Sequence, residues 1–146
     1  MTDLSKGIIE LEEMTITPET TKQEFDEKFG PVISPASCQT IVYLLKLSAV
    51  DNTLFGATFM FNDNGHISSV KLSPYIKYKS EKWDRTGMQE ERRQFCDQWL
   101  FERLGEPGRN LGGAEYVFDN LRISCVTHFD LHNGADAGYI VITYLR

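Results

Sequence analysis

The chain twice places a helix-forming stretch directly before a glycine with a proline close behind it. The first stretch ends at Phe29-Gly30-Pro31, and the second at Leu104-Gly105-Glu106-Pro107. Glycine readily adopts the left-handed conformation that closes a helix, and proline cannot continue one, so both helices are predicted to end at these points. A series of strand-like segments follows each stop. We therefore expect two related helix-plus-strand units that share one sheet.

The first unit is predicted to begin with a short strand or extended arm over residues 7–16. A helix over 18–29 follows, with Thr17 as its N-cap and Pro18 in its first turn. The three predicted strands cover 40–48, 54–61 and 66–72. Residues 40–48 are apolar on both faces, which suits a central strand. Residues 62–65, Asn-Asp-Asn-Gly, indicate a tight hairpin between the last two strands.

The second unit has the clearest helical period, over residues 88–104, and Trp99 lies on the apolar face of this helix. Three further strands are predicted over 114–118, 121–131 and 138–145, the last one interior to the sheet. Residues 118–124 also resemble residues 61–68 with one residue deleted, which agrees with an internal duplication. Residues 73–87 show no period and are predicted to form the longest loop.

The predicted fold class is α+β, with a mostly antiparallel sheet of about six strands and two helices on one of its faces. The 146 residues, 41% of them hydrophobic, are enough for one domain with a substantial core. We expect residues 1–146 to form that single domain, with half-units 8–72 and 88–145 joined by the loop 73–87.

The order of elements resembles two families of known fold. A helix, then "FG-P" or "LG-EP", then three antiparallel strands that include "F-x-D-N-G-x-I", is similar to the helix-plus-meander unit of the SmpA/OmlA outer-membrane lipoproteins. Two such units in tandem resemble the beta-lactamase inhibitor proteins. The resemblance covers about residues 17–145. It implies a curved sheet whose open face binds another protein.

Charge narrows the classes of partner. Lys and Arg total 15 against 21 Asp and Glu, which gives a net charge of −6 and argues against nucleic acids and anionic membranes. A basic protein partner is favoured electrostatically. The first six residues contain no apolar signal segment, and no stretch has the apolar length to span a bilayer, so we expect a cytoplasmic protein. The sequence leaves the oligomeric state open.

The aromatic and cationic side chains of the 73–87 loop form one candidate site. They are predicted either to anchor the loop on the sheet or to contact a protein. The polar face of the 121–131 strand is a second candidate surface. The candidate protein-binding residues are Tyr75, Tyr78, Trp83, Arg122, His128 and Asp130.

Motifs for catalysis and cofactor binding are weak. His128, Asp130 and His132 have the alternate spacing that could present three ligands to one metal ion, but a turn signal begins at Asn133. The three cysteines are odd in number and lack CxxC spacing, and Cys96 and Cys125 are predicted to be core residues. No nucleophile motif or glycine-rich phosphate loop is present, so no cofactor is expected.

The function predicted from these observations is that of a non-enzymatic protein-binding module. An immunity protein or an inhibitor, which neutralises a toxin or enzyme by binding it, fits the acidic charge and the resemblance. The alternative is a small metal- or ligand-binding enzyme that uses the face formed by His128, Asp130 and His132.

Overall fold

The computed structural model describes residues 2–30, 33–35, 41–44, 46–75, 85–110, 113–126 and 138–145, and these form an α+β structure. The first part of the chain contains η1 (Leu4–Lys6), β1 (Ile9–Glu10), β2 (Thr15–Ile16), α1 (Lys22–Phe29), β3 (Ile33–Pro35), β4 (Ile41–Leu44), β5 (Ser48–Val50), β6 (Thr53–Phe61) and β7 (Ile67–Pro74). The second part contains α2 (Arg85–Leu104), β8 (Arg109–Asn110), β9 (Ala114–Phe118), β10 (Leu121–Val126) and β11 (Tyr139–Tyr144).

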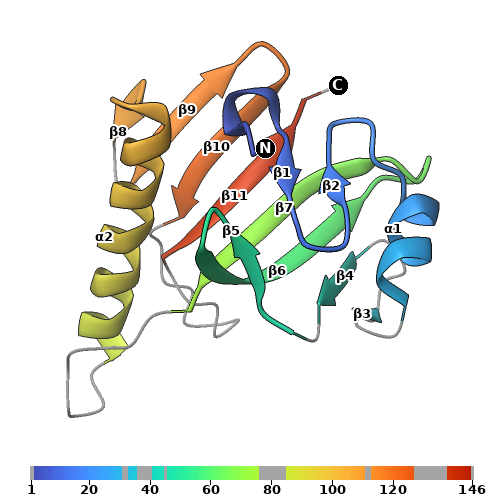
Figure 1. Ribbon diagram of the computed structural model, residues 1–146. Coiled ribbons are helices and arrows are strands. Elements are labelled where there is room, and N and C mark those ends of the chain that lie inside the picture. The colour runs from blue at the N-terminus through green and yellow to red at the C-terminus, as the bar shows by residue number, and fades with distance from the viewer. Residues whose placement is uncertain are drawn as a thin grey trace.

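A nine-stranded antiparallel sheet forms the centre of the structure (Figure 1). Its order is β3-β4-β6-β7-β11-β10-β9-β8, and β5 also pairs with β6. The last strands of the two predicted units, β7 and β11, are neighbours in the middle of the sheet, with Ile142 opposite Val70. The predicted interior position of the C-terminal strand is therefore confirmed.

The expected number of about six strands is wrong, because the sheet has nine and β1 pairs with β2 in a separate two-stranded sheet. Residues 40–48 do not form one central strand. They contain β4, opposite Thr58 to Met60, and only the first residue of β5, which continues to Val50 and lies opposite Thr53 to Phe55. The nine-residue strand β6 is long enough to pair with both along the same edge.

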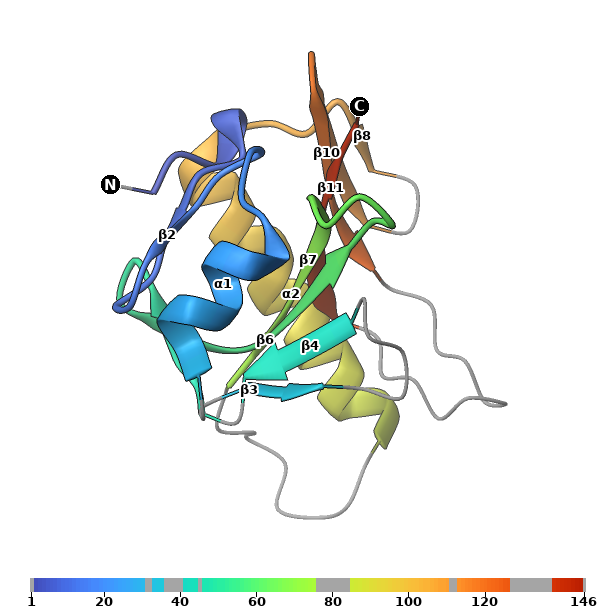
Figure 2. The same ribbon diagram turned by 90° about the vertical axis from the view of Figure 1, so that its right-hand side faces the viewer.

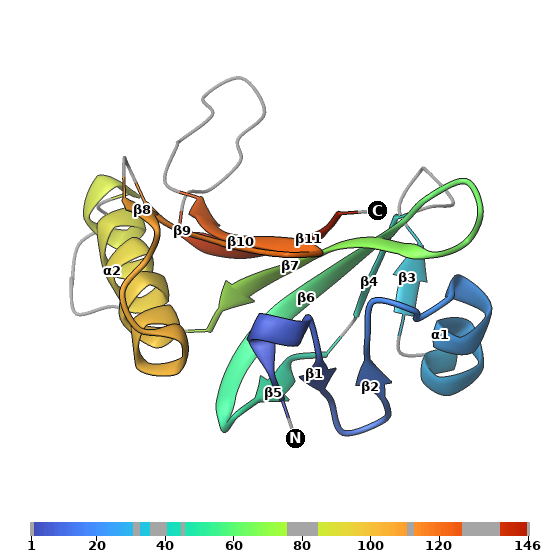
Figure 3. The same cartoon turned by 90° about the horizontal axis from the view of Figure 1, so that it is seen from above.

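The two helices and the β1–β2 hairpin lie on one face of the large sheet, as Figures 2 and 3 show. The buried sides of the strands contact them there. The Phe25 ring of α1 lies 4.6 Å from that of Phe59, and the Trp99 ring of α2 lies 5.1 Å from that of Phe55. These contacts confirm the predicted burial of Trp99 and place the core between the sheet and this layer.

The predicted start of the first helix is wrong by four residues. Thr21, not Thr17, is the N-cap: its Oγ1 accepts a hydrogen bond from the Glu24 backbone N–H at 3.2 Å, and the Glu24 carboxylate accepts one from the Thr21 N–H at 3.4 Å. The backbone just before the helix is hydrogen-bonded to another part of the chain. The Thr20 carbonyl accepts from the Ile67 N–H, so this segment is tied to the β6–β7 hairpin.

The predicted bounds of the 73–87 loop are wrong at both ends, because β7 continues to Pro74 and α2 begins at Arg85 instead of residue 88; residues 76–84 lie outside the described residues. Both helix stops are confirmed, and the Gly105 N–H donates to the Phe101 carbonyl at 2.8 Å. Residues 7–16 form part of the separate hairpin instead of a strand of the main sheet. Strand β10 extends to Val126, and the remainder of the predicted 121–131 strand lies outside the described residues.

Candidate functional site

The face of the nine-stranded sheet opposite the helices carries no helix in the part of the chain that the structure describes (Figure 3). We call it the open face. Residues on it alternate with core residues along each strand, as β-strand geometry requires. Met60, for example, lies between buried Phe59 and Phe61, and Arg122 lies between buried Leu121 and Ile123.

Strand register places the open-face residues in rows across the sheet. One row crosses six strands and a second crosses five. The first row is Val117, Arg122, Thr143, Ser69, Met60 and Ile41. The second is Glu115, Ser124, Val141, Lys71 and Thr58.

Exposed apolar groups lie among small hydroxyl side chains on this face. Val117, at one end of the first row, is 65% exposed, and Met60, one strand in from the other end, is 40% exposed. Between them lie Arg122, Thr143 and Ser69. The Lys71 ammonium lies 4.2 Å from the centre of the Tyr139 ring, a distance typical of a cation–π contact.

Two of the predicted protein-binding residues are described. Arg122 is exposed in the first row of the open face. Tyr75 follows β7 and is 66% exposed, with its backbone N–H bonded to the Leu54 carbonyl. The other predicted site residues lie outside the described residues: Tyr78, Trp83, His128, Asp130 and His132.

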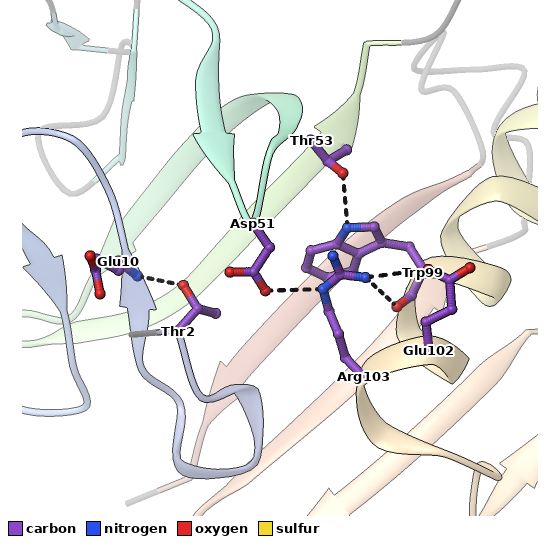
Figure 4. A network of polar contacts seen from close by, with 7 residues as sticks. All are labelled: Thr2, Glu10, Asp51, Thr53, Trp99, Glu102 and Arg103. Atoms are coloured by element: carbon purple, nitrogen blue, oxygen red, sulfur yellow. Dashed lines mark hydrogen bonds and ion pairs between the residues drawn. The ribbon is translucent and has the colours of Figure 1, made fainter.

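A polar network joins the β5–β6 turn to the end of α2 (Figure 4). The Arg103 guanidinium lies 3.9 Å from the centre of the Trp99 ring, and its Nε donates to Asp51 at 3.1 Å. Trp99 Nε1 donates to the Thr53 hydroxyl at 3.2 Å. Glu102 is a second carboxylate within 3.7 Å of the same guanidinium. The network therefore holds the β5–β6 turn against α2. Because these two carboxylates already neutralise the Arg103 guanidinium, the network is poorly suited to bind an anion.

The two described cysteines are core residues, as predicted. Cys96 Sγ donates to the Gly138 carbonyl at 3.4 Å, and Cys125 Sγ donates to the Arg93 carbonyl at 3.8 Å. A hydrogen bond with Cys96, together with burial, raises the pKa of the Cys125 thiol. Since the thiolate is the reactive form, this environment opposes nucleophilic chemistry at Cys125.

Among the described residues, no group of three or more His, Cys, Asp and Glu side chains is arranged to hold a metal ion. Neither described helix is both long and apolar enough to cross a membrane.

Comparisons with known proteins add little to this geometry. No protein-family model matches the chain, and no curated protein matches it. Among solved structures, the chain is similar to a DUF4309 family protein (YjgB) from Bacillus subtilis, with 16% identity over 86% of this chain and 78% of that chain. The TM-score of 0.46 is too low to establish a shared fold.

Proposed function

We propose that this protein binds another protein through the open face of its sheet. The observation that carries the proposal is the first row, which presents exposed Val117 at one end, Arg122 beside it, and exposed Met60 four strands away on β6. Protein interfaces typically combine apolar contacts of this kind with a polar surround. A broad, ordered sheet can offer such a surface without a conformational change.

Charge on the open face differs from that of the whole chain. Its two rows contain the cations Lys71 and Arg122 and the single carboxylate Glu115, although the chain carries a net charge of −6. The excess negative charge that would attract a basic partner therefore lies on other surfaces of the protein. Apolar and hydroxyl contacts are the main interactions that the open face provides.

The order of elements supports a duplicated architecture. Helix α1 precedes β4, β6 and β7, and α2 precedes β9, β10 and β11, while β7 and β11 pair at the centre. We propose on this basis that the chain contains two helix-plus-meander units of the kind that the SmpA/OmlA and beta-lactamase inhibitor proteins contain. For such a tandem arrangement, the resemblance implies binding through the open face.

The more specific role that we propose is that of a bacterial immunity protein or inhibitor, acting in the cytoplasm. Its support is the combination of net negative charge, a broad binding face and the resemblance described above. This role predicts that a neighbouring gene encodes a toxin or an enzyme that the protein masks. A neighbourhood of metabolic genes only would contradict it.

The binding proposal is tested with a double variant of the open face, Met60→Glu and Val117→Glu. Both side chains are exposed in the free protein, so the fold should tolerate the change. In the complex, the two glutamates would be buried against apolar groups of the partner, which would disrupt that contact. The full chain is used to capture a partner from cells of its source, and complex formation is then measured with the purified partner by calorimetry.

The double variant should weaken the complex by about 100-fold or more, the usual size of an interface hot spot. A matched control is Gln23→Glu, which adds a charge to an exposed position of α1 on the opposite side of the sheet. Equal binding by wild type and the double variant would show that the open face is not the interface. Failure to recover any stoichiometric partner would contradict the binding function itself.

A further inference from the structure

A groove lies between the outer side of α2 and the β8–β9 edge of the sheet, away from the open face. Its volume is about 350 Å³. The helix contributes Gln94, Asp97, Gln98 and Phe101, whose i, i+3, i+4, i+7 spacing places them on one stripe. The other lining residues are Glu106, Pro107, Asn110, Ala114 and Tyr116.

The charge of this groove is uniformly negative. Two of its nine lining residues are carboxylates, Asp97 and Glu106, and none is Lys, Arg or His. Asp97 Oδ1 accepts a hydrogen bond from the Ala114 backbone N–H at 3.2 Å, which fixes the carboxylate against β9. The pKa of the Tyr116 hydroxyl is raised by burial and then by the charges of Asp97 and Glu106. Both carboxylates therefore lie near enough to this hydroxyl to influence its ionisation.

The neutral side chains of the groove add hydrogen-bond acceptors to its two carboxylates. The Gln94 amide nitrogen donates to Glu90 at 3.3 Å, and the Gln98 amide nitrogen donates to Glu102 at 3.2 Å. Each amide oxygen is therefore left as a hydrogen-bond acceptor. The Tyr116 hydroxyl donates inward, to the Gly105 carbonyl at 2.7 Å.

One wall of the groove is an exposed aromatic ring. Phe101 is 45% exposed at the end of the polar stripe of α2, where the rest of the apolar helix face is turned into the core. A planar guanidinium can stack on such a ring while it donates to carboxylate and amide oxygens. This combination of an aromatic wall and two carboxylates, one of them held in place by the Ala114 N–H, is complementary to arginine.

We infer that this groove binds an arginine side chain of a protein partner. The guanidinium would donate to Asp97 and Glu106, and its flat face would contact Phe101. This site goes beyond the proposed open-face function, because it lies on a different surface and neither depends on the other. At this site, two of the carboxylates that make the chain acidic would contact a cation of the partner directly.

The experiment titrates the ¹⁵N-labelled full chain with N-acetylarginine methylamide at 0.15 M salt and follows the backbone amide signals. A saturable shift is expected at Ala114, whose N–H bonds to Asp97, and at Phe101, with a Kd on the order of millimolar. The neutral citrulline analogue should produce no saturable shift. Equal shifts from the citrulline analogue, or shifts spread over the whole surface, would overturn the inference.

Two variants test the groove residues, and one tests charge alone. Asp97→Asn keeps an oxygen for the Ala114 N–H but removes the charge, and should weaken binding by about tenfold. Phe101→Ala removes only an exposed ring, so it tests the site even if Asp97→Asn destabilises the fold. The control is Glu27→Gln, an equal charge change on exposed α1, which should leave the affinity unchanged.

Unchanged affinity in both Asp97→Asn and Phe101→Ala would overturn the inference. The lysine analogue of the probe separates charge from shape, because its ammonium cannot stack as a flat cation. We expect weaker binding by the lysine analogue. Equal affinity for the two probes would overturn the assignment of the groove to arginine.

Discussion

At the scale of the residue, Gly138 determines how closely α2 approaches the sheet. It is buried directly before β11 with φ of +83°, and its N–H donates to the Val126 carbonyl at 2.7 Å. A Cβ atom here would lie 2.5 Å from the Arg92 Cβ and 2.8 Å from the Arg93 backbone N. Both the backbone conformation and the helix contact therefore require glycine.

Gly138→Ala is expected to lower the free energy of unfolding by about 2–4 kcal/mol, the sum of left-handed strain and a clash with the helix. Gly65→Ala is a matched control, because Gly65 has a similar φ of +81° but no neighbouring atom within 4 Å of the added carbon. It should cost only about 1 kcal/mol. Urea unfolding measures both, and equal losses would show that helix contact at Gly138 is unimportant.

At the scale of the element, the start of α1 illustrates a limit of sequence patterns. Thr17-Pro18-Glu19 and Thr21-Lys22-Gln23-Glu24 both look like the beginning of a helix, and only the second is a complete capping box. This local signal is reinforced by hydrogen bonds to residues distant in sequence. The Lys22 N–H donates to the Gly65 carbonyl, and the Ile67 N–H donates to the Thr20 carbonyl.

Thr21→Ala should lower the free energy of unfolding by about 1 kcal/mol, because it removes the N-cap hydroxyl that accepts the Glu24 N–H. Thr17→Ala removes a hydroxyl that accepts the Glu19 N–H in an exposed turn, and should cost less. Helix content from circular dichroism and unfolding midpoints compare the two. A larger loss for Thr17→Ala would contradict the observed helix boundary.

The sequence predicted which segments form helices and which form strands. It did not predict which strands pair, or where one apolar segment gives way to a second strand. The alternation of Leu121, Ile123 and Cys125 correctly predicted one buried face of β10, since that period depends only on local geometry. The presence of two strands, β4 and β5, where one was predicted over 40–48 depends on their pairing with the long strand β6, which is a tertiary property. The groove had one local signal: Phe101 lies at the end of a polar helical stripe.

At the scale of the whole molecule, the two ends of the chain meet in the layer beside the sheet. The buried Tyr144 hydroxyl of β11 donates to the Gly7 carbonyl at 2.8 Å, across 137 residues of sequence. Gly7 has φ of +72°, and a Cβ there would lie 2.7 Å from the Tyr144 ring. No periodic pattern near Gly7 or Tyr144 indicates this contact, because it depends on where the complete sheet places its last strand.

Tyr144→Phe should therefore lower the free energy of unfolding by about 1–3 kcal/mol, because it leaves a buried carbonyl without this donor. It should also accelerate hydrogen exchange at Gly7 and Ile8, whose amides hold the N-terminal turn. Tyr116→Phe is the control: it removes a comparable hydroxyl bond, to Gly105, at the other end of the core layer. Faster exchange at Gly7 and Ile8 in both variants would indicate general loosening, and unchanged exchange in Tyr144→Phe would show that β11 does not hold the N-terminal turn.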